Sequence, residues 1–128
     1  MQIIFDTHII LWCINDDVKL PRAAAELIDN PDNELYFSSA VIWEISIKAA
    51  AKRPDFPFDP AIIRHALLQN GWNELPINGD HSVAVGSLPP IHGDPFDRIQ
   101  VAQATVEGIL LVTSDGKLAQ YPGPIKVV

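Results

Sequence analysis

The chain has 128 residues, which is enough to bury one hydrophobic core but too short for two ordinary domains, so we expect a single domain spanning residues 1–128. Hydrophobic residues make up 48% and charged residues 20%, as in globular proteins, and no apolar run approaches the roughly 20 residues that cross a bilayer. The net charge of −7 argues against binding a phosphate backbone by bulk electrostatics, unless cations held by carboxylates attract it locally.

Cysteine content and the N-terminus indicate the cellular compartment. Cys13 is the single cysteine and cannot form an internal disulfide, and no Cys/His cluster has zinc-site spacing. A strand-like run at residues 2–5 meets Asp6 at once, which does not resemble a secretion signal. We therefore expect a cytoplasmic protein with no membrane partner.

Short apolar runs alternate with helical patterns along the whole chain, and helix starts are marked by capping residues such as Ser38, Asp59 and Asp94. The expected elements are strand 2–5, helix 8–14, helix 22–28, strand 34–37, helix 39–52, helix 60–70, a short strand within 72–76, helix 81–88, helix 95–108, strand 109–112, a brief helix before Tyr121 and strand 125–128. This alternation predicts an α/β fold, a three-layer α/β/α sandwich with a central parallel sheet.

The predicted helix 95–108 carries a charge where a buried helix should have none. Asp94 and Pro95 form a typical helix start, and apolar residues on opposite sides of the helix predict that it is covered all round. Asp97 shares the face of Val101 and Ala104, where a lone carboxylate is costly to desolvate. The alternative is that Asp97 lies in the first turn only to favour the helix dipole, and for Asp94 a plain capping role is the better interpretation.

Two further acids follow predicted strands. Asp6 comes directly after strand 2–5, and Asp115 follows strand 109–112 after two hydroxyl residues. In parallel α/β sheets, ligands bind outside the carboxyl ends of the strands, at the point where the strand order reverses. Each acid also has a simpler interpretation as the N-cap of the next helix.

Glu44 is an acid on an apolar helix face. It shares that face with Ala40, Val41 and Ile47, so it needs a compensating partner. The simple alternative is a surface ion pair with Lys48, one helical turn further along.

Asp6, Glu44, Asp97 and Asp115 could therefore converge on one pocket, where their like charges would repel one another unless a cation binds. Oxygen ligands in this number suit Mg²⁺ or Mn²⁺. A Mg²⁺ ion held by a few carboxylates keeps water molecules that can attack phosphorus, and this chemistry cleaves phosphodiesters. It requires neither a nucleophilic side chain nor a glycine-rich loop.

Four short segments of the sequence form a recognisable set. In chain order these segments are Phe5-Asp6-Thr7, Ser39 to Lys48, Asp94-Pro-Phe-Asp97-Arg98 with Ala102-Gln-Ala104, and Leu111 to Asp115. Together they resemble the PIN-domain family, and in particular the VapC-type toxins of bacterial toxin–antitoxin pairs. The resemblance covers essentially the whole chain. It implies a metal-dependent endoribonuclease that uses Mg²⁺, with Mn²⁺ as a substitute, forms homodimers, and is silenced by a cognate antitoxin whose tail crosses the active site.

The resemblance also implies roles for individual residues. The four acids correspond to Asp6, Glu44, Asp97 and Asp115, and Thr7 with Thr113 or Ser114 would help to orient water. Many relatives carry a further acid or amide shortly after the last aspartate, whereas Gly116, Lys117 and Leu118 stand here. We therefore expect one well-held Mg²⁺, and a second only if Asp94 contributes or the RNA phosphate recruits it.

Several other residues have weaker signals. Arg98 contacts either a phosphate or a neighbouring carboxylate, and none of the four histidines has a partner at a telling spacing, although His92 beside Asp94 is the best of them. Trp43 is expected in the core or at a dimer interface rather than stacked on bases. Phe56 and Phe58, in a Pro-rich loop, are candidates for antitoxin contact.

Two other function classes compete with a nuclease. A phosphoacceptor receiver domain is also a Mg²⁺-binding α/β fold of this length, but it requires an acidic pair after the first strand, and Asp6-Thr7 is not such a pair. It also requires a lysine that ends a later strand, whereas Lys117 lies beyond Asp115. The other alternative is a catalytically idle PIN fold that acts as a binding module, against which the presence of all four acids counts.

Overall fold

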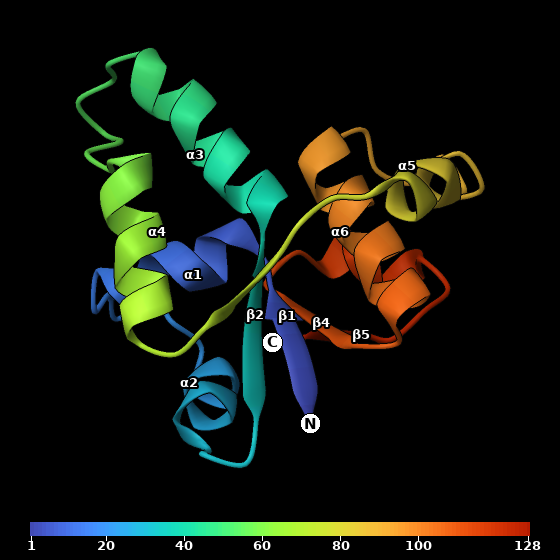
Figure 1. Ribbon diagram of the computed structural model, residues 1–128, viewed down its shortest axis with the longest axis horizontal. Helices are drawn as coiled ribbons and strands as arrows, with labels where there is room; N and C mark the ends of the chain where they lie inside the picture. Colours follow the sequence, from blue (N-terminus) through green and yellow to red (C-terminus); the bar gives the residue numbers. More distant parts are fainter.

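The computed structural model describes residues 1–128 and is built around a five-stranded sheet in the order β3-β2-β1-β4-β5, in which every neighbouring pair is parallel (Figure 1). The elements are β1 (Gln2–Phe5), α1 (Thr7–Ile14), α2 (Arg22–Asp29), β2 (Glu34–Ser38), α3 (Ser39–Ala50), α4 (Pro60–Gln69), β3 (Asn73–Leu75), α5 (Gly79–Val85), α6 (Pro95–Glu107), β4 (Leu110–Thr113), the short 3₁₀ helix η1 (Gly116–Gln120) and β5 (Ile125–Val127). The predicted fold class is confirmed, and most element boundaries differ from the prediction by one to three residues.

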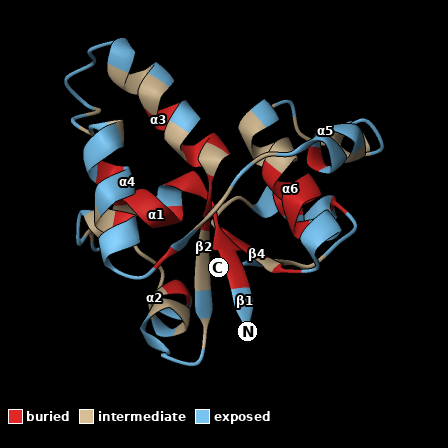
Figure 2. Cartoon of the chain, in the orientation of Figure 1, coloured by how far each residue is buried: buried red, intermediate tan, exposed pale blue.

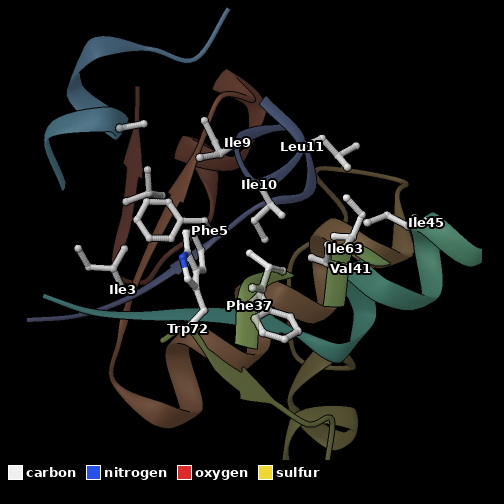
Figure 3. Packing of buried hydrophobic residues seen from close by; sticks show 13 residues of the cluster. Ile3, Phe5, Ile9, Ile10, Leu11, Phe37, Val41, Ile45, Ile63 and Trp72 are labelled. Atoms are coloured by element: carbon white, nitrogen blue, oxygen red, sulfur yellow. The ribbon is translucent and has the colours of Figure 1, made fainter. Parts of the chain in front are cut away.

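The two faces of the sheet are covered by different helices, which makes the three layers (Figure 1). Because side chains alternate along a strand, Ile3 and Phe5 of β1 face one side and Ile4 faces the other. The larger cluster lies between the sheet and helices α1 to α4, and its side chains interdigitate around Phe5 and Trp72 (Figure 3). The smaller cluster lies between the sheet, α6 and η1.

Helix α6 begins and ends as its sequence predicts, but it is not covered all round. Asp94 caps its first turn, and Gly108 ends it in the left-handed conformation with φ of 67°. Buried residues occupy the middle of the helix, whereas Val106 in the last turn is 42% exposed (Figure 2). The prediction was wrong here because α6 belongs to an outer layer, so its last turn faces solvent.

Strand β1 has β2 on one side and β4 on the other. The strand order therefore reverses at the carboxyl end of β1. Asp6 follows β1, α3 follows β2 directly, and Thr113 ends β4. This edge of the sheet is where α/β folds place their ligands. No helix has the length and apolar character required to span a membrane.

Candidate active site

Asp6 lies at the carboxyl end of the central strand and is buried, with 4% of its surface exposed. One carboxylate oxygen accepts the backbone N–H of Ile9 at 3.0 Å. The other accepts the hydroxyl of Thr113 at 2.5 Å and the backbone N–H of Ser114 at 3.2 Å. Burial raises the pKa of Asp6, and these three hydrogen bonds oppose the rise.

Glu44 on α3 is the second buried acid, with 6% of its surface exposed. The hydroxyl of Thr7 donates to its Oε1 at 2.5 Å, and the ammonium of Lys48 donates to its Oε2 at 2.9 Å. The predicted ion pair with Lys48 therefore exists, but its acid is buried. The predicted apolar face is only partly buried, because Ile47 is 50% exposed. We call Asp6 and Glu44 the inner pair.

Asp97 and Asp115, which we call the outer pair, are more accessible. Their side chains are 20% and 37% exposed. Asp115 accepts the backbone N–H of Lys117 at 3.0 Å, and its other oxygen lies 2.8 Å from Nε2 of His92. The nearest charged partner of the Asp97 carboxylate is the same His92 nitrogen, at 3.5 Å.

The charge around Asp97 shows that the acids converge. Burial, and then the negative charges of Asp94 and Asp6, raise the pKa of Asp97 to about 7, with a further contribution from Glu44 and an opposing one from His92. For Asp115, burial raises the pKa, but hydrogen bonds from Lys117 and His92 outweigh it and leave the pKa below its ordinary value. The structure thus brings together the four acids that the sequence singled out.

The simpler capping interpretations also hold, alongside the clustering. Asp6 caps α1, Asp94 caps α6 by accepting the backbone N–H of Phe96 at 2.8 Å, and Asp115 caps η1. The two interpretations do not exclude each other, because a cap uses only part of the carboxylate. For Asp94, one oxygen is engaged in this way, which favours the plain capping role that its sequence indicated.

His92 is the residue that sequence reasoning undervalued. Its Nε2 contacts both members of the outer pair, so it has partners that its spacing in the sequence did not reveal. The buried His81 also has one, because its Nε2 lies 3.2 Å from Oε1 of Glu107. The useful signal was that His92 stands two residues before a helix cap, where its Nδ1 accepts the backbone N–H of Asp94 at 3.0 Å.

Arg98 forms no ion pair, contrary to one of the two predicted roles. Its guanidinium donates to the backbone carbonyl of Pro89 at 2.9 Å and to the hydroxyl of Tyr121 at 3.0 Å. It also approaches the carbonyls of Val85 and Leu88 at 3.3 and 3.5 Å. Arg98 therefore holds the loop between α5 and α6 in place.

The donor set fits a hard divalent cation. Four carboxylates gather at one edge of the sheet, and the raised pKa of Asp97 reflects first its burial and then negative charge that the surrounding protein does not neutralise. His92, Asp97 and Asp115 each offer an atom within 4.8 Å of one another. Oxygen atoms dominate this set, which favours Mg²⁺ or Mn²⁺ over zinc.

Comparison with known proteins decides the family, because residues 3–124 match the PIN domain. The chain belongs to the PIN domain family. It is similar to ribonuclease VapC22 of Mycobacterium tuberculosis, with 27% identity over 138 residues, covering 98% of this chain and 97% of that protein. The family that the sequence motifs predicted is therefore confirmed.

Solved structures share the PIN fold. VapBC2 from Rickettsia felis, bound to a DNA fragment from its promoter, superposes with a TM-score of 0.75 at 18% identity, covering 99% of this chain and 98% of that one. VapBC-1 from nontypeable Haemophilus influenzae gives a TM-score of 0.66 at 19% identity over the same shares of the two chains. This likeness extends over the whole length of the chain and confirms the three-layer architecture.

Proposed function

We propose that residues 1–128 form a metal-dependent endoribonuclease that hydrolyses RNA phosphodiester bonds and acts as the toxin of a toxin–antitoxin pair. The observation that carries this proposal is the convergence of Asp6, Glu44, Asp97 and Asp115 at the carboxyl edge of the sheet. The ribonuclease activity of the similar VapC22 protein supports it. An RNA substrate agrees with the predicted cytoplasmic location.

In this proposal, Asp6, Asp97 and Asp115 hold Mg²⁺, with Glu44 beside them, and Mn²⁺ can substitute. When bound, the ion would supply positive charge that neutralises the phosphate and promotes ionisation of the attacking water. The protein's own contribution is orientation: the hydroxyls of Thr113 and Thr7 fix the carboxylates of Asp6 and Glu44 through hydrogen bonds of 2.5 Å. Both threonines thus orient carboxylates, and Ser114 does so through its backbone N–H.

The direct test is cleavage of a labelled total-RNA pool by the purified protein with Mg²⁺ or Mn²⁺, with EDTA, and with Asp6→Asn and Asp97→Asn variants. We expect discrete fragments that disappear with the chelator and fall by at least about 100-fold in either variant, because charge stabilisation by a metal is worth several kcal/mol. Asp32→Asn, at an exposed loop position, is the matched control and should cut normally.

Three outcomes contradict parts of this proposal. Cutting that survives both substitutions would indicate a contaminating nuclease. Metal binding without cutting would favour the idle binding module, and formation of an acyl phosphate with a small phosphodonor would favour the receiver.

A small antitoxin is the proposed protein partner, as the VapBC complexes among the similar structures suggest. A cleft of about 400 Å³ next to Lys48 is lined in part by the rings of Trp12, Phe56 and Phe58. Phe56 and Phe58 pack edge to face at 5.1 Å and remain partly exposed, which keeps them candidates for this contact. Co-purification with the product of the neighbouring open reading frame, lost in a Phe56→Asp variant that still folds, tests the assignment.

A homodimer is the proposed assembly, supported by an apolar surface at the start of α6. Trp43 is 61% exposed and packs edge to face against Phe96 at 5.3 Å, so it lies outside the core and its predicted alternative, an interface, remains. These rings, with Ile77 and Ile99, line a second hollow of about 450 Å³. We expect Trp43→Arg to lower the molecular mass measured by light scattering, whereas Val18→Lys, at a fully exposed site, should leave it unchanged.

A further inference from the structure

The hydrogen bonds of His92 determine where its ring carries a proton. Nδ1 accepts the backbone N–H of Asp94 at 3.0 Å. A backbone amide can only donate, so Nδ1 has no proton, and in a neutral imidazole the proton must lie on Nε2. That Nε2–H lies 2.8 Å from Oδ2 of Asp115 and 3.5 Å from Oδ2 of Asp97. His92 therefore donates to the outer pair.

The backbone of His92 is fixed as well as its ring. Its N–H donates to the hydroxyl of Tyr121 at 2.8 Å, and Tyr121 is buried in the smaller core cluster. The same hydroxyl accepts the guanidinium of Arg98 at 3.0 Å. Arg98 also donates to the carbonyl of Pro89 in the same loop. His92 is thus held at three points, which are its backbone, its Nδ1 and its Nε2.

This geometry separates His92 from the ligands of the proposed metal centre. Three atoms of His92, Asp97 and Asp115 lie close enough to hold one ion. The nitrogen among them carries a proton, however, and a protonated nitrogen has no lone pair to give to a cation. Of these three groups, only the two carboxylates remain as ligands. Each carboxylate can accept a hydrogen bond and bind an ion at the same time, because it has lone pairs for both.

We infer that His92 is a positioning residue whose Nε2–H holds the carboxylates of Asp115 and Asp97 in the orientation that receives the divalent cation, without ligating it. This inference rests on the proposed metal-dependent function. The physical need for such a residue is clear at the outer pair, where two negative groups face each other and the carboxylate of Asp97 has no other charged partner. Hydrogen bonds that orient metal ligands typically change affinity by about 10- to 100-fold.

The test measures Mn²⁺ affinity by calorimetry at pH 8, so that its result does not depend on RNA cleavage. His92→Ala should bind Mn²⁺ about 10- to 100-fold more weakly than the unaltered chain. His92→Gln places an amide N–H near the position of Nε2 and should recover most of the loss. Tyr121→Phe should give an intermediate loss, and His65→Ala, at an exposed position on α4, should give none.

Two spectroscopic measurements distinguish positioning from ligation and from a merely structural role. Two-bond ¹H–¹⁵N correlation of the metal-free protein should show the Nε2–H form of His92. Pulsed electron paramagnetic resonance of the Mn²⁺ complex should show no directly bonded nitrogen. A Nδ1–H form, a bonded nitrogen that disappears in His92→Ala, or unchanged affinity in a folded His92→Ala protein would each overturn the inference.

The proposed nuclease function can fail separately. If the affinities and spectra follow this pattern while RNA stays intact in every sample, the positioning role of His92 stands and the nuclease proposal does not. If the unaltered chain binds no Mn²⁺, both are overturned.

Discussion

The inner and outer pairs of acids solve the problem of a crowded negative charge in different ways. Asp6 and Glu44 are buried, and each carboxylate accepts hydrogen bonds from groups that the fold holds in place. Asp97 and Asp115 face the solvent more, and they share a single side-chain donor, His92. Fixed donors therefore offset part of the cost of burying the inner pair, whereas in the outer pair Asp97 is left with charge for a cation to neutralise.

Thr113→Val is the substitution from which we expect the largest effect, and it keeps the shape of the side chain. It removes the donor to Asp6 and also the hydroxyl that accepts the backbone N–H of Asp115 at 3.0 Å. We expect the free energy of unfolding to fall by about 2–3 kcal/mol, because one lost hydrogen bond involves a buried charged group. Thr105→Val, which removes a hydroxyl from an exposed helix position, is the matched control for chemical denaturation. Equal losses in the two variants would contradict the special role of the inner pair.

The next test uses pH and the outer pair. The pKa of Asp97 is about 7 in the folded chain against an ordinary value of 3.8, so between these values the folded state keeps a proton that the unfolded state releases. The stability contributed by the protonated Asp97 carboxyl group is therefore fully present below about pH 4 and is lost as the pH rises through 7. We expect Asp97→Asn to be more stable than the unaltered chain at pH 8 in EDTA, by on the order of 1–2 kcal/mol after allowing for solvent screening.

Thermal unfolding at pH 5 and pH 8 checks this second prediction. The stability advantage of Asp97→Asn should shrink at pH 5, where Asp97 in the unaltered chain is already protonated. At pH 8 it should also shrink when Mg²⁺ is added. Asp32→Asn should show no such dependence. An Asp97→Asn protein that is less stable at pH 8 would mean that the carboxylate is compensated by the fold after all.

The smallest effect is expected from Lys48, the partly exposed partner of the inner pair. Lys48→Met removes the ammonium that contacts Glu44, but the lysine side chain is 39% exposed. We expect a loss of less than about 1 kcal/mol in chemical denaturation, with Lys52→Met as the control, because the ammonium is partly in water and Glu44 keeps its hydrogen bond from Thr7. A loss as large as that of Thr113→Val would show that Lys48 is a structural member of the inner pair.

Much of this architecture could be predicted from sequence because its signals are local. The alternation of strands and helices, the caps at Asp59 and Asp94, and acids that directly follow apolar strands all lie within a few neighbouring residues. The carboxyl ends of parallel strands then bring such acids to the same edge, so the positions of Asp6 and Asp115 in the chain were enough to place them together.

The parts that could not be predicted depend on the path of a loop. The contact of His92 with Asp115 joins residues 23 positions apart, and it exists because Arg98 and Tyr121 hold the loop before α6. No periodicity encodes such a path. The exposure of Ile47 was missed for a related reason, since a helix pattern gives the apolar positions but not where the covering layer ends.

The hydrogen bond between Thr113 and Asp6 also has a consequence for the timing of synthesis. It joins residues 107 positions apart, and the strands that carry them, β1 and β4, lie side by side in the sheet. A ribosome makes Asp6 before it makes Thr113 and Asp115. The complete acid cluster therefore cannot exist in any unfinished chain that stops before Asp115, so synthesis must pass this residue before the proposed nuclease can act.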